Sequence, residues 1–145
     1  MSTSAETPII SIRGLVNRFG DQTVHDGLDL DVYRGEVLGV VGGSGTGKSV
    51  LMRSIIGLQQ PQAGSITVFG QSMLDCEATD PELLAVKKRW GILFQNGALF
   101  STLTVSENVQ VPLREYYPDM PAHLRAEIAA YKILMTGLPE NAGPK

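Results

Sequence analysis

A single glycine-rich run constrains this chain more than any other feature. Residues 42–49 read GGSGTGKS and match G-x-x-x-x-G-K-[ST], the pattern of a phosphate-binding loop. Backbone N–H groups can curl around phosphate oxygens only where no Cβ obstructs the turn. Gly42, Gly43, Gly45 and Gly47 remove that obstacle. The run therefore predicts a site for a nucleoside triphosphate.

The remaining residues of the loop supply charge and a metal ligand. We expect Lys48 to reach the β- and γ-phosphates as a compact cation, and the Ser49 hydroxyl to bind Mg²⁺, which prefers oxygen. A helix that begins at the end of the loop would add its positive dipole to the site. The cofactor-binding residues predicted here are Gly42, Gly43, Ser44, Gly45, Thr46, Gly47, Lys48, Ser49 and Val50.

The segments on both sides of the loop support this interpretation. Residues 37–41 form a short apolar run, which is typical of a buried parallel strand. Leu51, Ile55 and Ile56 follow at helical spacing, and Gly57 can end that helix. Strand, glycine loop and helix is the order that a phosphate-binding loop requires. The alternative is a flexible surface loop with an incidental lysine.

Composition narrows the class of protein. The chain has 145 residues, enough for one domain, and its 43% hydrophobic and 19% charged residues are ordinary for a globular protein. A net charge of −3 argues against a nucleic-acid partner. Cys76 is the one cysteine, which excludes an intrachain disulfide and fits a reducing cytosol. Residues 1–8 do not resemble a signal peptide, and we expect them to be disordered. No apolar run is long enough for direct membrane insertion.

Hydrophobic periodicity predicts an α/β fold with an antiparallel beginning and a helix-rich C-terminal third. Val24, Leu28, Leu30 and Val32 occupy even positions, as the buried face of a half-buried strand does. His25 and His123 match no motif, and we expect both at the surface or half-buried. The basic residues 87–89 are interpreted as a solvated helix end. Strands are also predicted at 9–16, 65–69 and 90–94. Helices are predicted after Asp80-Pro81 and after a capping box at Thr104 and Glu107. A third helix is predicted over 121–135, with a core stripe formed by Leu124, Ile128, Tyr131 and Met135.

Three further motifs identify a family. Phe19 precedes a glycine in a turn before the loop, residues 93–95 read LFQ at a predicted strand end, and residues 103–109 read LTVSENV. In this order they resemble the nucleotide-binding subunit of ABC transporters, over nearly all of residues 9–145. The resemblance implies a P-loop NTPase fold with a RecA-like core, an antiparallel β subdomain and the start of a helical subdomain.

The resemblance also implies roles for single residues. Phe19 matches the aromatic residue that stacks on the adenine of ATP. Gln95 matches the glutamine that contacts Mg²⁺ and the attacking water, so Gln95 and Lys48 are the expected catalytic residues, with Ser49 and Gln95 as metal ligands. The alternatives are that Phe19 packs within its turn and that Gln95 caps a strand end.

A closer resemblance is to the ATPases of Mla-type phospholipid transporters, also described as toluene-tolerance or organic-solvent-resistance transporters. It depends most on residues 96–100, which read NGALF. In that family this stretch contacts the coupling helix of the permease, and Leu99 and Phe100 would suit an apolar groove. The alternatives are that both side chains belong to the core, and that the transporter carries amino acids or lipoproteins.

Several motifs of the family do not occur in these 145 residues: the LSGG-type signature, the strand that ends in Asp-Glu, and the switch histidine. We therefore expect a truncated, N-terminal part of a longer subunit that holds Mg–ATP without the general base for hydrolysis. The complete subunit is expected to be an ATPase, to form a homodimer, and to lie in the cytoplasm on the inner face of the plasma membrane through its permease. The other interpretation is a catalytically silent nucleotide-binding fragment.

Overall fold

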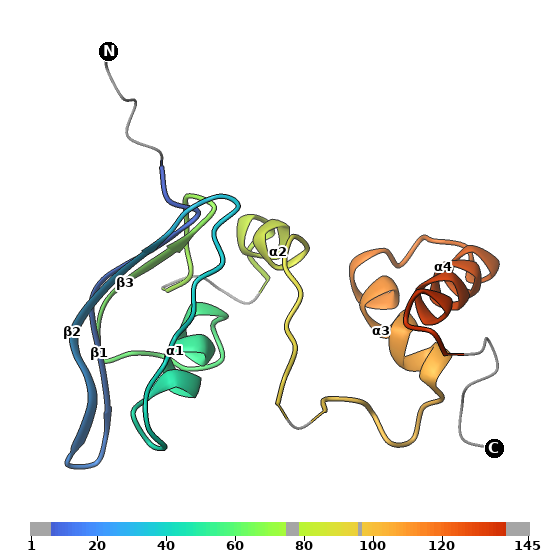
Figure 1. The fold of residues 1–145 in the computed structure, drawn as a ribbon. Helices are drawn as coiled ribbons and strands as arrows, with labels where there is room; N and C mark the ends of the chain where they lie inside the picture. The colour runs from blue at the N-terminus through green and yellow to red at the C-terminus, as the bar shows by residue number, and fades with distance from the viewer. Residues whose placement is uncertain (1–6, 75–78, 96, 139–145) are drawn as a thin grey trace. The chain divides into compact units, whose positions relative to one another are not determined.

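The computed structural model describes residues 7–74, 79–95 and 97–138, and the chain divides into two compact units. The first unit comprises residues 1–90 and the second residues 91–145 (Figure 1). Most of the expected disordered start, as well as Cys76 and Asn96, lies outside the described residues.

The first unit is built on a four-stranded antiparallel sheet with the strand order β2-β1-β3-β4 (Figure 1). The strands are β1 (Ile10–Phe19), β2 (Gln22–Val32), β3 (Ala63–Val68) and β4 (Gln71–Ser72). A turn at Gly20 and Asp21 joins β1 and β2 into a hairpin. The strands predicted at 9–16 and 65–69 and the half-buried strand through residues 24–32 are thereby confirmed, and so is the antiparallel beginning of the chain.

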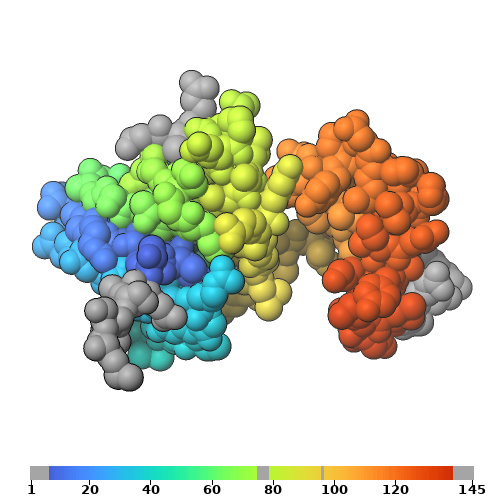
Figure 2. Space-filling view, turned by 90° about the horizontal axis from the view of Figure 1, so that it is seen from above, coloured from blue at the N-terminus to red at the C-terminus, as the bar shows by residue number. Residues whose placement is uncertain are grey.

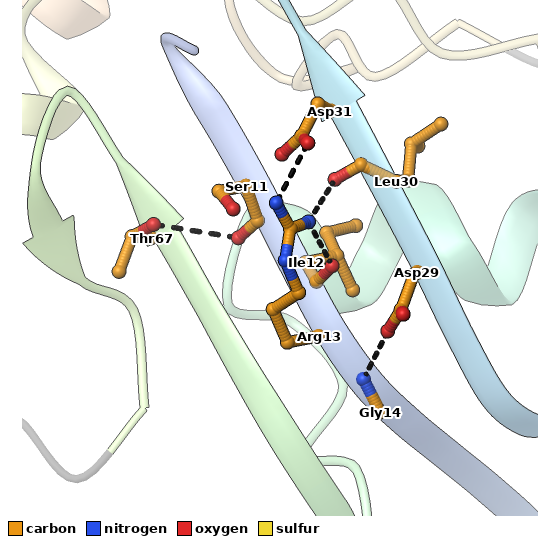
Figure 3. Close-up of polar contacts among 8 residues, drawn as sticks. All are labelled: Ser11, Ile12, Arg13, Gly14, Asp29, Leu30, Asp31 and Thr67. Carbon is orange, nitrogen blue, oxygen red and sulfur yellow. Dashed lines mark hydrogen bonds and ion pairs between the residues drawn. The ribbon is translucent and has the colours of Figure 1, made fainter. Parts of the chain in front are cut away.

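The β1–β2 pairing contains bulges, and polar side chains stabilise the first of them. The register shifts between Ile12 and Leu15, and the Gly14 N–H there donates to Asp29 Oδ1 at 2.6 Å (Figure 3). Nearby, Arg13 Nη2 donates to Asp31 Oδ2 at 2.6 Å. This hydrogen bond lowers the pKa of Asp31 and raises that of Arg13. Asp29 and Asp31 of β2 thus make polar contacts with β1 across the hairpin, as polar side chains of a half-buried strand can.

Two helices, α1 (Lys48–Ile55) and α2 (Pro81–Lys87), lie on the same side of this sheet (Figure 1). Asp80 caps α2 by accepting a hydrogen bond from the Glu82 N–H at 2.8 Å, which confirms the predicted helix start. The helices bury apolar side chains against the strands. The core consists of Ile12, Leu15, Leu51, Ile66, Val68, Met73, Leu74, Leu83 and Val86.

Two of the predicted strands are wrong. Residues 37–41 and 90–94 carry no regular secondary structure, and the exposed fractions of Val37, Val41 and Leu93 are 98%, 92% and 95%. An apolar run indicates a segment that burial would stabilise. A strand, however, forms only where a neighbouring strand completes its backbone hydrogen bonds. Among the described residues, no strand pairs with either segment.

Of the basic residues 87–89, Lys88 and Arg89 are exposed, which fits a solvated helix end, but Arg89 has a further contact. Its Cζ atom lies 3.7 Å from the centroid of the Phe69 ring, as in a cation–π contact. Phe69 follows β3 with a φ of 52°, an unusual backbone conformation for an aromatic residue. The end of α2 is therefore tied to the turn between β3 and β4.

The second unit contains α3 (Val105–Tyr116) and α4 (Ala122–Met135), which contact each other and appear as adjoining orange and red surfaces (Figure 2). The predicted capping box is confirmed, because Thr104 Oγ1 accepts from the Glu107 N–H at 3.2 Å and Glu107 Oε2 accepts from the Thr104 N–H at 2.8 Å. None of the described helices is long and apolar enough to cross a membrane.

The predicted core stripe of the last helix is wrong. α4 buries Ala129 and Ile133, whereas the exposed fractions of Tyr131 and Met135 are 62% and 64%. The buried residues are four positions apart, so they still follow the helical period. The sequence periodicity correctly predicts the spacing of the buried residues. Which side of α4 is buried depends on where α3 packs.

Candidate nucleotide-binding site

The glycine loop leads directly into α1, as predicted. The helix begins at Lys48, within the loop motif, and Gly47 is its N-cap residue with a φ of 94°. Lys48, Ser49 and Val50 therefore form the first turn, where backbone N–H groups have no acceptor within the helix. This arrangement is a favourable environment for an anion.

The side chain of Lys48 lies over the loop. Its Nζ atom donates to the carbonyl oxygens of Gly42 and Gly43 at 2.7 and 2.5 Å, and lies 3.4 Å from Thr46 Oγ1. Thr46 Oγ1 in turn donates to the Gly43 carbonyl oxygen at 3.0 Å. The positive charge is thus held next to the loop, where it can neutralise the phosphates of a nucleotide.

Gly47 makes the closest approach between the loop and the sheet. A Cβ atom at this position would lie 2.3 Å from Val24 Cγ1 and 2.7 Å from His25 Nε2, both on β2. Gly47 is buried, and its positive φ is itself unfavourable for a residue with a side chain. Contact with β2 therefore limits how closely the C-terminal end of the loop can approach the sheet.

Most of the loop is open to solvent. Ser49 is exposed in the first turn of α1, so its hydroxyl is accessible to a metal ion that a triphosphate would also bind. Lys48 and Val50 are half-buried. These positions suit Mg²⁺, whose remaining ligands would be phosphate and water oxygens.

Phe19 lies at the end of β1, opposite Gln22 in the hairpin. Its side chain is 46% exposed, so much of the residue is accessible to a ligand. The hairpin turn and the glycine loop lie at the same end of the first unit (Figure 1). The structure thus places an accessible aromatic residue at the end of the unit where the sequence predicts a nucleotide.

The other predicted site residues belong to the second unit. Gln95 is exposed, and the residues directly before it, 90–94, form no strand, so Gln95 does not cap a strand end. Its contact with the nucleotide stays a prediction. Leu99 and Phe100 are 73% and 57% exposed. Asn108 holds their segment: its Oδ1 accepts from the Phe100 N–H at 2.8 Å, and its amide donates to carbonyl oxygens of residues 100, 103 and 104.

Sequence reasoning missed a buried polar group behind the loop. The prediction for His25 is wrong, because its side chain is 7% exposed, and Asn17 and Ser54 beside it are 1% and 0% exposed. The cause is a change in which face of β2 is buried. Leu28 pairs with Leu15, but Asp26 pairs with Val16, so Gly27 is an extra residue in β2. A slip of one residue turns the odd positions inward, which no motif in the sequence announces.

The ABC transporter family model matches residues 25–141, which is most of the chain. This chain belongs to the ABC transporter family. Among its curated relatives are the probable ribonucleotide transport ATP-binding protein mkl of Mycobacterium leprae, 38% identical over 129 residues, and the intermembrane phospholipid transport system ATP-binding protein MlaF of Haemophilus influenzae, 36% identical over 130 residues. The matches cover 89% and 90% of this chain but 36% and 48% of those relatives. The chain therefore spans less than half of the length of these relatives.

A solved structure has the same fold. It is the dimeric ATP-binding cassette MJ0796, described as a post-hydrolysis state bound to ADP and Pi, with a TM-score of 0.78 and 26% identity. The similarity covers 90% of this chain and 58% of that one. The predicted fold class, a P-loop NTPase of the ABC type with an antiparallel subdomain, is thereby confirmed as part of an ABC ATPase domain.

Proposed function

We propose that this chain is the part of an ABC transporter ATP-binding subunit that binds Mg–ATP. The phosphates bind the loop at residues 42–49 and the first turn of α1, Mg²⁺ binds Ser49, and adenine stacks on Phe19. The observation that carries this proposal is the position of the Lys48 ammonium group, 2.7 and 2.5 Å from the two carbonyl oxygens at the start of the loop. A cation held there, beside the N-terminus of α1, suits a triphosphate.

In the complete subunit, Gln95 contacts Mg²⁺ and the attacking water, and hydrolysis is coupled to transport. We assign Leu99 and Phe100 to the contact with a membrane-embedded permease, since both are exposed apolar side chains on a segment that Asn108 holds in place. Two such subunits form a homodimer on the inner face of the plasma membrane. The dimeric ABC cassette of similar fold supports that arrangement.

Phospholipid is the proposed cargo. The MlaF relative is named for intermembrane phospholipid transport, and the NGALF segment resembles that group. Other relatives are named for ribonucleotide transport and methionine import. Purification of the complete subunit with its permease, followed by mass spectrometry of the bound molecules, tests it. Phospholipid supports the assignment, and an amino acid or a lipoprotein in its place contradicts it.

Substitution of Lys48 tests nucleotide binding directly. Lys48→Ala removes the charge at the loop, so we expect Mg–ATP affinity of the chain to fall by at least about tenfold, and turnover of the complete subunit to be abolished. Lys132→Ala is the matched control, because it removes the same charge from an exposed position on α4. Isothermal titration calorimetry measures both. Equal affinity of Lys48→Ala and the unaltered chain would contradict the proposal.

A catalytically silent nucleotide-binding chain is the second candidate function, and it concerns residues 1–145 acting by themselves. Phosphate release from the 145-residue chain, measured together with ATP affinity, tests it. Binding without phosphate release supports the silent chain. Hydrolysis that Lys48→Ala abolishes contradicts it.

A further inference from the structure

Three buried polar side chains from three different elements meet behind the glycine loop. We call them the Asn17–His25–Ser54 cluster; they come from β1, β2 and α1. Asn17 Nδ2 lies 3.1 Å from His25 Nδ1 and 3.3 Å from Ser54 Oγ, and Ser54 Oγ lies 3.5 Å from Asn17 Oδ1. Buried polar groups are costly unless they are hydrogen-bonded, and here each member has a partner within the cluster.

The hydrogen bonds determine the chemical state of the imidazole. An amide nitrogen can only donate, so His25 Nδ1 accepts from Asn17 and the neutral ring carries its hydrogen on Nε2. Burial also lowers the pKa of His25, which favours the neutral form. The ring is therefore oriented by Asn17, with Nε2 directed to the side where Gly47 lies.

The cluster touches the loop at its most constrained residue. His25 Nε2 and Cε1 would lie 2.7 and 3.1 Å from a Cβ atom on Gly47, so the imidazole is in close contact with the glycine that caps α1. At the other end, Asn17 lies two residues before Phe19 on β1. The cluster thus connects the strand that ends at the proposed adenine contact with the loop that forms the proposed phosphate contact.

We infer that His25 is a positioning residue for nucleotide binding: the Asn17–His25–Ser54 cluster holds Gly47 at a set position relative to the Phe19 hairpin, so that one ATP molecule reaches both. This inference rests on the proposed function. The two Asn17–Ser54 contacts restrict the rotation of α1 against the sheet, and the contact with His25 orients the Asn17 amide that makes them. The chain thereby aligns its two proposed ligand contacts before ATP binds.

Two substitutions of His25 separate positioning from simple stability. His25→Leu keeps a similar volume but removes one of the two acceptors of the Asn17 amide, whereas His25→Gln retains a side chain that can accept from Asn17 and donate towards the loop. We expect His25→Leu to weaken Mg–ATP binding about tenfold and His25→Gln to stay within about threefold of the unaltered chain. His123→Leu on the exposed surface of α4 is the matched control and leaves the affinity unchanged.

A shorter ligand distinguishes positioning from partial unfolding. Inorganic triphosphate uses the loop but not Phe19, so His25→Leu should weaken its binding only about twofold. If the variant merely unfolds a fraction of the chain, both ligands lose affinity equally, and that result overturns the inference. Unchanged ATP affinity in His25→Leu overturns it as well. If His25→Leu fails to fold, Ser54→Ala disrupts the same cluster more mildly. We again expect a larger loss of affinity for Mg–ATP than for inorganic triphosphate.

Nitrogen NMR of the imidazoles supplies a readout independent of affinity. The chain has two histidines, so the His123→Leu variant assigns the His25 signal. We expect the Nε2–H tautomer, and a shift of the loop amide signals in His25→Leu without ligand. A fast exchange between tautomers, or unchanged loop amides, overturns the inference even if Mg–ATP binds. Failure of the unaltered chain to bind Mg–ATP instead counts against the proposed function, while the loop amides still decide whether the cluster holds the loop.

Discussion

The two flanks of the glycine loop differ sharply in how this chain supports them. On the C-terminal side, Gly47 is buried against Val24 and His25, and α1 places Leu51 in the core of the first unit. On the N-terminal side, residues 37–41 carry no regular structure, and Val37 and Val41 are almost fully exposed. The same loop thus has one flank held by tertiary contacts and one without them.

The difference shows which contacts keep a phosphate-binding loop in shape. Both flanks are apolar, so hydrophobicity alone does not separate them. The helical flank satisfies its backbone hydrogen bonds within α1 and needs only a surface to pack on, which the β1–β2 hairpin supplies. A strand has no internal hydrogen bonds and depends on a neighbour. Substitutions on the helical flank should therefore destabilise the chain far more than equivalent substitutions on the other flank.

The largest expected difference in stability is between alanine substitutions of two glycines, Gly47 on the helical flank and Gly39 on the other flank. Gly47→Ala places a Cβ atom 2.3 Å from Val24 Cγ1 at a φ of 94°, so we expect a loss of about 4 kcal/mol in the free energy of unfolding. At Gly39 an added Cβ meets nothing within 4 Å, and Gly39→Ala should change the free energy by less than about 0.5 kcal/mol. Urea denaturation measures both, and similar losses would show that the flanks are equally constrained.

Truncation of an apolar side chain on each flank should give the next largest difference. Leu51 is 5% exposed, so Leu51→Ala should cost about 3 kcal/mol through lost burial and the cavity that remains. Val41 is 92% exposed, and Val41→Ala should cost less than about 0.5 kcal/mol. Thermal unfolding followed by circular dichroism is the measurement. A large loss for Val41→Ala would mean that residues 37–41 are buried in solution.

The smallest expected effect is a dependence of stability on pH that comes from His25, which lies on β2 against the helical flank of the loop. Because burial lowers the pKa of His25 below 6.5, the unfolded chain takes up a proton that the folded chain resists. The free energy of unfolding should therefore fall as the pH drops below about 6.5, and become level again once the folded imidazole is protonated. Urea denaturation at about pH 7.5 and about pH 5.5 measures the change.

The control for the pH dependence is the second histidine. His123→Leu should retain the loss of stability between these two pH values, since His123 lies exposed on α4. His25→Gln, which has no proton to gain, should remove that part of the loss. An equal pH dependence of stability in both variants would assign the effect to carboxylates. The lowered pKa of His25 would then no longer support a neutral imidazole in the cluster.

Much of the fold was predictable because its signals are local. The glycine loop, the Asp80 cap and the capping box at Thr104 each depend on residues within a few positions of one another, and each forms as expected. The hairpin around Gly20 likewise follows from one turn between two apolar segments. These elements satisfy most of their hydrogen bonds from neighbouring residues, so a short stretch of sequence contains the required information.

Family resemblance extended these predictions to residues that no local pattern identifies. Phe19 and Gln95 were singled out by resemblance, and the first of them lies, still accessible, at the same end of the first unit as the loop. The second lies in the other unit, where its predicted contact with the nucleotide is a matter for experiment. The family model and the similar solved structure support the fold, while the residue roles stay proposals.

From the order of its residues alone, this chain specifies a glycine loop with a lysine, a helix behind it and an antiparallel hairpin in front. The buried Asn17–His25–Ser54 cluster, the closeness of Gly47 to β2 and the exposure of residues 37–41 became apparent only in the folded chain. The physical reason is that hydrogen bonds within a helix or a turn are made by neighbours in sequence. Burial depends instead on which distant surface is available, and one extra residue at Gly27 was enough to turn His25 inward.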